Sequence, residues 1–207
     1  SFSIIGQIGY VVMGLALDTP LALAGALFFL VHNMIVKTAL LLTGGIAERL
    51  AGTGDIRRLG GLYAGRPVLA YGYLLCALSL AGVPPFSGFF GKLALIQASF
   101  SGRAWVVTTI AIAASFLSLA YGMKVWIYAF WRPAPADVLD MAPGWRSPRV
   151  ESAARGMTWS VVALAGLMLL MSVFSGPVMA YCVTTAEGLL DPAEYLRAVL
   201  GNGGAAR

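Results

Sequence analysis

The sequence of 207 residues is 59% hydrophobic and only 11% charged, with a mean hydropathy of +0.81 and a net charge of +5. Soluble domains carry roughly 45–50% apolar and about 25% charged residues, so this composition excludes an ordinary soluble fold and indicates a membrane protein. The positive charge does not indicate nucleic-acid binding, because the arginines are scattered over short connectors and are not gathered on one solvated face.

Apolar segments alternate with polar connectors along the chain. A helix that crosses a membrane needs ~20 mostly apolar residues. We expect such helices over residues 3–17, 21–46, 67–83, 104–131 and 157–183, with a further apolar segment after residue 85. The sequence therefore predicts an all-α membrane protein with about six transmembrane helices, or five if residues 67–100 form a single interrupted crossing.

The polar segments divide the chain into four parts. We expect a transmembrane unit over residues 1–132, a polar loop over 133–156, a final transmembrane helix over 157–183 and an amphipathic or disordered tail over 184–207. The connector 52–62 has turn residues that suit a small hairpin. With six crossings, the two arginine-rich connectors fall on opposite sides of the membrane, so the positive-inside rule gives no orientation. Because the chain opens directly in an apolar segment, we expect it to be the later part of a longer protein.

The type of ionisable residue differs between the apolar segments and the polar connectors. All eleven arginines and all nine carboxylates lie in connectors, at segment ends or in the tail. The residues that lie within apolar segments are the three lysines and the single histidine: Lys37, Lys92, Lys124 and His32. Ionisable groups inside a membrane cost at least ~2.5–3.5 kcal/mol each and are functional candidates. A desolvated ammonium can release its proton, whereas a guanidinium stays charged, so the pattern indicates a proton or cation pathway.

Lys37 lies deep in its apolar segment, where its side chain cannot easily reach the membrane surface. Asn33 lies one turn earlier on the same helix face. His32 lies about 140° around the helix from Lys37, so no direct contact between them is expected. For both ionisable residues two interpretations stand: a place in a proton pathway, or a polar contact that only joins helices.

Lys92 follows a predicted interruption of its helix. The residues expected to form this break are Pro84, Pro85, Gly88 and Gly91. Consecutive prolines lack N–H donors, and irregular backbone at membrane depth is tolerated only where protein or water covers it. Transporters use such interrupted helices to hold ions. We therefore expect a non-helical turn within residues 83–92, with the Ser87 hydroxyl nearby. Lys92 should face the bundle interior, roughly 10–15 Å from Lys37. The alternative is a lysine that reaches the lipid headgroups.

The remaining candidates indicate no further chemistry. Lys124 can reach the membrane surface from its position near Trp131, so it is either an interfacial anchor or a secondary pathway residue. Cys76 and Cys182 are isolated in apolar segments and are predicted to be packing residues. Because there is no Cys/His cluster and no nucleotide-binding glycine loop, we expect no metal, no cofactor and no enzymatic active site.

Three stretches resemble a known family: HNMIVKTALLLTGGIAE, GTGDIRRLGGL and LSLAGVPPFSGFFGKLALI. They are similar to the antiporter-like subunits shared by Mrp-type multisubunit Na⁺/H⁺ antiporters and respiratory complex I, and most similar to the D-type subunit of the Mrp antiporters. The resemblance covers residues 1–132 well. It implies the second of two inverted five-helix repeats, followed by a final helix. It also implies that Lys37 joins the central hydrophilic axis to the second half-channel, and that Lys92 is the terminal charged residue on the broken helix. His32 matches a polar, often histidine-bearing stretch, and Lys124 matches no family position.

The resemblance implies a proton-conducting subunit of a multisubunit Na⁺ or K⁺/proton antiporter in a bacterial inner membrane. Its partners would be other membrane subunits, the lipid bilayer and the transported ions, and no nucleic acid. The alternative is a proton-pumping membrane subunit of an NADH-quinone oxidoreductase-like or membrane hydrogenase complex. A third class is a scaffold whose lysines only fix helix packing. In each case the chain is a membrane subunit and not an enzyme by itself.

Overall fold

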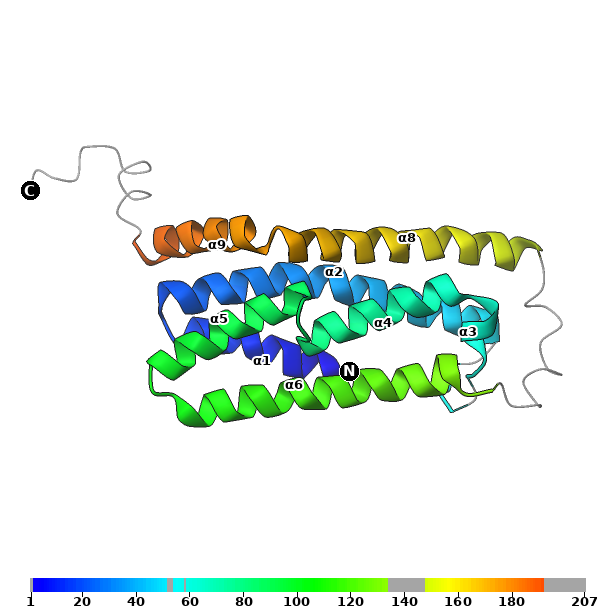
Figure 1. The fold of residues 1–207 in the computed structure, drawn as a ribbon, viewed down its shortest axis with the longest axis horizontal. Coiled ribbons are helices and arrows are strands. Elements are labelled where there is room, and N and C mark those ends of the chain that lie inside the picture. Colours follow the sequence, from blue (N-terminus) through cyan, green and yellow to red (C-terminus); the bar gives the residue numbers. More distant parts are fainter. Residues whose placement is uncertain (1, 52–53, 58, 134–147, 192–207) are drawn as a thin grey trace, which may run out of the picture.

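The computed structural model describes residues 2–51, 54–57, 59–133 and 148–191, which form helices and connecting turns with no strand among them. The helices are α1 (Phe2–Ala16), α2 (Pro20–Ala51), α3 (Leu62–Gly65), α4 (Pro67–Ala81), α5 (Ser87–Ser101), α6 (Trp105–Trp126), the π-helical turn η1 (Ile127–Trp131), α8 (Pro148–Val173) and α9 (Ser175–Leu190). The long helices lie side by side along one axis (Figure 1). The predicted all-α fold is confirmed.

Helix length and composition show where this bundle can cross a membrane. Three described segments are long and apolar enough to do so, Pro20–Leu50, Trp105–Trp131 and Ala153–Val173, and two shorter helices, Ile5–Ala16 and Pro67–Ala81, are also apolar. In Figure 1, α4 and α5 run one after the other in the same direction, beside α2 and α6. They therefore form one interrupted crossing, as in the five-crossing alternative.

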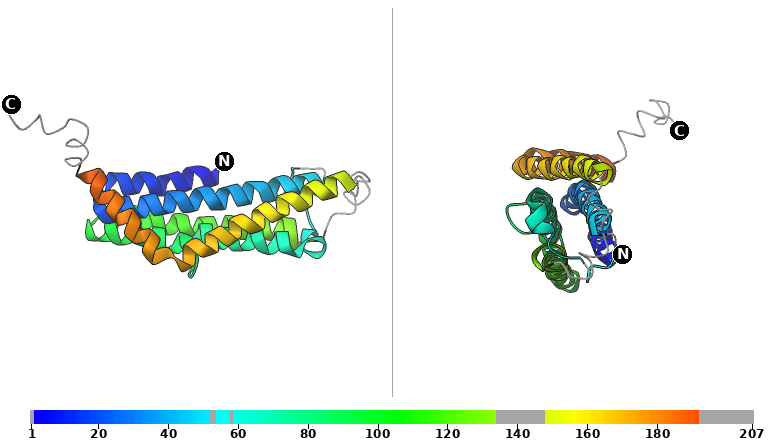
Figure 2. Two further views of the ribbon diagram at one scale, coloured as in Figure 1. Left: turned by 90° about the horizontal axis from the view of Figure 1, so that it is seen from above. Right: turned by 90° about the vertical axis from the view of Figure 1, so that its right-hand side faces the viewer.

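Helix α2 is the centre of the bundle. It contacts α1, α4, α5, α8 and α9, and Figure 2 shows α8 and α9 laid along one side of it. Its fully buried apolar side chains include Phe28, Phe29, Val36, Ala39 and Ile46. Helix α6 instead exposes large apolar side chains, among them Val106, Ile110, Phe116 and Leu117. An outer face of this kind suits lipid or another membrane helix and does not suit water.

The end of the chain differs from the predicted boundaries. Helix α8 begins at Pro148, so the predicted polar loop 133–156 becomes helical within its last part. Helix α9 continues to Leu190, so the predicted tail 184–207 begins as helix. The other parts of that loop and tail, residues 134–147 and 192–207, lie outside the described residues.

The predicted final helix over 157–183 is not a single element. The chain changes direction at Phe174, between α8 and α9 (Figure 2). The cause is Pro177, which has no N–H to donate to the carbonyl four residues earlier. The neighbouring Gly176 also weakens helical propensity. These two residues interrupt the helix in the same way that the Pro84-Pro85 pair interrupts the earlier one.

The connector after α2 contains no hairpin in the part that is described. Residues 54–57 and 59–61 form turns and irregular backbone, so the expectation of a hairpin over 52–62 is wrong for them. Instead of a hairpin, a backbone hydrogen bond joins the connector to a distant part of the chain. The Gly61 N–H donates to the Arg132 carbonyl at 2.7 Å. This bond ties the connector to the end of η1.

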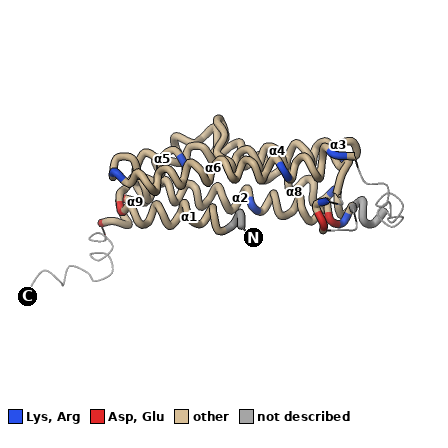
Figure 3. Tube along the Cα trace, turned by 90° about the horizontal axis from the view of Figure 1, so that it is seen from below, with Lys and Arg blue, Asp and Glu red and all other residues tan. Residues whose placement is uncertain are grey.

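Charged residues gather at the two ends of the bundle, with only isolated positive residues between them (Figure 3). Because α4 and α5 form one crossing, the connector after α2 and the start of α8 lie at the same end (Figure 1). The described arginines at this end are Arg49, Arg57, Arg66, Arg132, Arg149 and Arg155, whereas Arg103 lies in the turn between α5 and α6 at the other end.

Candidate functional site

A break between α4 and α5 organises the site. Helix α4 ends at Ala81, and Gly82 takes the left-handed conformation (φ 87°) that suits a residue without a side chain. The N–H groups of Gly82 and Val83 turn back to the Leu78 carbonyl, at 3.2 and 3.1 Å. Helix α5 then begins at Ser87. The predicted non-helical turn within residues 83–92 is confirmed, although it starts one residue before that range, at Gly82.

The two prolines leave two backbone carbonyls free. In a continuous helix, the carbonyls of Leu80 and Ala81 would accept hydrogen bonds from the residues four positions later. Those residues are Pro84 and Pro85, which have no N–H. The ammonium of Lys92 replaces both donors, with Nζ at 2.9 Å from the Leu80 oxygen and 3.1 Å from the Ala81 oxygen.

Lys92 is therefore an interior residue, as predicted, and only 3% of it is exposed. Its Nζ also lies over two aromatic rings, 4.8 Å from the ring centroid of Tyr10 and 5.7 Å from that of Phe29. The partners of this ammonium in the described part of the chain are thus carbonyl dipoles and π-faces. Such partners stabilise a positive charge without fixing it in an ion pair.

His32, on α2, lies beside the same break. It is completely buried, and its Nδ1 is 2.9 Å from the hydroxyl of Ser87, the first residue of α5. Its Nε2 has no hydrogen-bond partner in the part of the chain that the structure describes. The polar contact between helices is thus present, and the free nitrogen leaves this imidazole able to exchange a proton or bind water.

Gly88 and Gly91 do not belong to the break, contrary to the prediction. Both lie within α5. A Cβ atom at Gly88 would lie 1.9 Å from the Ser79 carbonyl oxygen and 2.8 Å from His32 Nε2, and one at Gly91 would lie 3.1 Å from the side chain of Phe29. These glycines let α5 pack closely against α2 and the end of α4, which brings Lys92 to the free carbonyls.

Gly88→Ala is therefore expected to destabilise the assembled protein by at least about 1–3 kcal/mol, because backbone must move to admit the methyl group. The measurement is thermal unfolding of the purified complex that contains the full-length subunit. Gly166→Ala on α8 is the matched control, because the added carbon would meet no atom within 4 Å apart from the backbone of its own helix and its chain neighbours. It should be at least as stable as the wild type, since alanine favours a helix more than glycine does. Equal stability of the two variants would contradict this role of Gly88.

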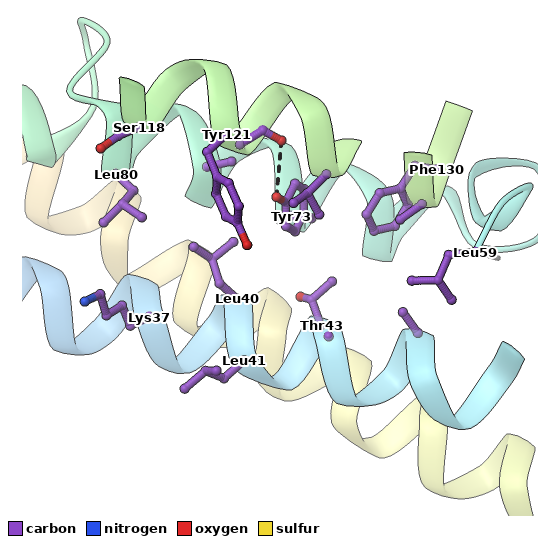
Figure 4. A pocket seen from close by; sticks show the side chains of 16 residues that line it. Lys37, Leu40, Leu41, Thr43, Leu59, Tyr73, Leu80, Ser118, Tyr121 and Phe130 are labelled. Carbon is purple, nitrogen blue, oxygen red and sulfur yellow. Dashed lines mark hydrogen bonds between the residues drawn. The ribbon is translucent and has the colours of Figure 1, made fainter. Parts of the chain in front are cut away.

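Lys37 lies on α2 beside a cavity of about 260 Å³ lined mainly by α2, α4 and α6. Figure 4 shows Tyr121 extending from α6 toward α2 and Leu40, with the Tyr73 hydroxyl bonded to the Gly122 carbonyl at 3.2 Å. The lining is mainly apolar, with Thr43 and Ser118 among its polar members. Lys37 is half-buried and brings a positive charge to this lining. The distance of roughly 10–15 Å between Lys37 and Lys92 stays a prediction.

A second hollow places Asn33 on the same face as Lys37, because both residues line it together with Leu30, Met34, Thr38 and Leu41. Asn33 is buried, and its Oδ1 has no hydrogen-bond partner among the described residues. The predicted shared face is confirmed.

Three other residues singled out in the sequence lie elsewhere. Lys124 is exposed on α6, which separates it from the buried site, and its interpretation as an interfacial anchor stays a prediction. Cys76 and Cys182 are buried free thiols, as the packing interpretation predicts.

Sequence reasoning missed a set of polar contacts between α1 and α6. The Tyr10 hydroxyl bonds the Ala111 carbonyl and lies 2.6 Å from the Ser115 hydroxyl. One turn away, Gln7 Nε2 donates to Ser118 Oγ at 3.1 Å. The available signal was spacing: in each apolar segment, two residues that can form hydrogen bonds lie three positions apart, on one helix face.

Comparison with known proteins agrees with this architecture. Residues 1–118 match the family described as "NADH:quinone oxidoreductase/Mrp antiporter, TM". The chain is 38% identical to the D-type subunit of the Na⁺/H⁺ antiporter from Alkalihalophilus pseudofirmus over 97% of its own length, and 32% identical to that from Bacillus subtilis over 96%. It covers only 39% and 38% of those relatives, or about two fifths of each.

The three-dimensional likeness is close as well. A chain in the structure of the Mrp complex from Dietzia sp. DQ12-45-1b superposes with a TM-score of 0.80 and 30% identity, over 97% of this chain and 44% of that one. Sequence and fold therefore lead to the same conclusion: the chain belongs to the NADH:quinone oxidoreductase/Mrp antiporter family of transmembrane proteins.

Proposed function

We propose that this chain carries the proton pathway of one half of an antiporter-like subunit, within a multisubunit Na⁺ or K⁺/proton antiporter. The observation that carries the proposal is the Lys92 ammonium, buried at a helix break on the two carbonyls that Pro84 and Pro85 leave free. An amine held by dipoles can bind and release a proton without breaking an ion pair. The names of the relatives from Alkalihalophilus pseudofirmus and Bacillus subtilis support the antiporter.

In the proposed pathway, protons pass between Lys37 and Lys92 through water. The cavity beside Lys37 has room for several water molecules, since each needs only about 10–15 Å³ of such volume. His32 offers a free ring nitrogen next to the break, and the Ser87 hydroxyl fixes its other nitrogen. These side chains supply the exchangeable sites, and the transported cation drives their protonation and deprotonation.

The placement of arginines supports one orientation in a bacterial inner membrane. With α4 and α5 as one crossing, the arginine-rich connectors share one end of the bundle. By the positive-inside rule, this end faces the cytoplasm. The exposed apolar face of α6 then suits either lipid or a neighbouring membrane subunit of the complex.

The test is proton movement by the purified complex containing the full-length subunit, reconstituted in liposomes with a pH-sensitive dye inside. A Na⁺ or K⁺ gradient alone should move protons, with no electron donor present. Proton movement that requires NADH and a quinone would instead show the redox-driven alternative. Absence of proton movement under both conditions, from a complex that is intact by size-exclusion chromatography, would reject a transport role.

A further inference from the structure

Tyr10, on α1, forms part of the wall around the Lys92 ammonium. The side chain is 3% exposed, and its ring lies nearer to Nζ than the ring of Phe29 does, at 4.8 Å against 5.7 Å. The face of an aromatic ring attracts a cation but not a neutral amine. A ring at this position therefore favours the protonated form of Lys92.

Contacts from two other helices, α2 and α6, hold this ring in place. Its hydroxyl is bonded to the Ala111 carbonyl and the Ser115 hydroxyl of α6. The Phe29 ring of α2 packs against it with centroids 5.3 Å apart and planes tilted by 52°. One turn earlier on α1, the bond between Gln7 and Ser118 fixes the register of α1 against α6. The ring is thus oriented before the proton arrives, so little reorganisation opposes charging of the amine.

We propose that Tyr10 is a positioning residue for proton exchange at Lys92, acting through its ring. When a proton joins the lone pair of the amine, the ring stabilises the resulting ammonium at the break, and loss of the proton removes that attraction. The hydroxyl holds the ring, since it is engaged by α6 and the amine lies over the ring face. This inference rests on the proposed function of Lys92.

The first experiment compares Tyr10→Phe with Tyr10→Leu in the full-length subunit of the reconstituted complex. Tyr10→Phe keeps the ring and should keep most of the maximal rate of cation-driven proton movement. Tyr10→Leu removes the ring and should lower that rate by about 5- to 30-fold, at an unchanged half-saturating cation concentration. Trp126→Leu removes a ring that is equally buried but packs on Tyr73 and Phe130 instead, and should keep the wild-type rate per complex.

The second experiment changes mainly the electron density on the face of the ring. Phenylalanines with one, two, three and five fluorine atoms, introduced at position 10, have nearly the same size as phenylalanine but attract a cation progressively less. The maximal rate should fall stepwise along this series, and packing alone predicts no such order. This series tests the role of the ring even if the complex with Tyr10→Leu does not assemble.

Three results would overturn the assignment: Tyr10→Phe as slow as Tyr10→Leu, an unchanged rate along the fluorinated series, or an equal loss in Trp126→Leu. Lys92→Ala separates this inference from the function on which it rests. If Lys92→Ala is inactive while the Tyr10 variants are normal, only the role of Tyr10 fails. If Lys92→Ala is fully active, the proposed function of Lys92 fails first.

Discussion

Lys92→Ala in the full-length subunit is expected to abolish cation-driven proton movement while the complex still assembles. The substitution removes the titratable group that closes the break between α4 and α5. It also leaves the carbonyls of Leu80 and Ala81 without their donor, at a cost of about 1–3 kcal/mol for each one that water does not reach. A moderate loss of thermal stability should therefore accompany the complete loss of transport.

Two further substitutions at position 92 separate charge from titration. Lys92→Arg keeps donors for both carbonyls but holds its proton at every working pH, so we expect an assembled and inactive complex. Lys92→Glu is expected to keep part of the activity, because a carboxyl group also titrates reversibly. It should remain slower than lysine, since an ionised carboxylate would face two carbonyl oxygens and offer them no donor.

The measurement is the initial rate of proton movement in liposomes, divided by the amount of complex incorporated. Lys124→Ala is the matched control, because this lysine is exposed on α6 and should be dispensable for transport. A wild-type rate in Lys92→Ala or Lys92→Arg would remove Lys92 from the pathway. An equal loss in Lys124→Ala would show that any lost positive charge, and not this amine, accounts for the effect.

The features that the sequence predicted well depend on local chemistry. The absence of two N–H groups at Pro84 and Pro85 interrupts a helix in any surroundings, so the break and the need of its carbonyls for partners could be foreseen. The burial of Lys92 followed from its position within an apolar segment. The shared face of Asn33 and Lys37 followed from helix periodicity alone.

The features that it did not predict depend on which segments meet. Whether α4 and α5 count as one crossing or two is decided by their common packing along α2 and α6. The role of Gly88 could be recognised only from the structure, which places the Ser79 carbonyl where a side chain at position 88 would lie. The Tyr10–Ser115 contact joins residues 105 positions apart, and no local pattern states which polar residues of two apolar helices face each other.

Lys37→Ala is expected to abolish cation-driven proton movement as well, but with little effect on stability. Lys37 is half-buried beside the cavity between α2, α4 and α6, and the structure shows no hydrogen bond that its loss would break within the described residues. In this respect it differs from Lys92, whose amine has two carbonyl partners. The contrast gives a clear expectation: both alanine variants lose transport, and only Lys92→Ala also unfolds at a lower temperature.

Lys37→Arg tests whether Lys37 must release its proton. An arginine would keep the positive charge next to the cavity and hold it permanently, so transport should be lost although the charge of the protein is unchanged. Lys124→Arg makes the same exchange on the exposed side of α6 and should transport at the wild-type rate. If Lys37→Arg moved protons as fast as the wild type at equal complex abundance, Lys37 would act only as a fixed charge. Full activity in Lys37→Ala would exclude even that, leaving Lys92 and His32 to carry the pathway without it.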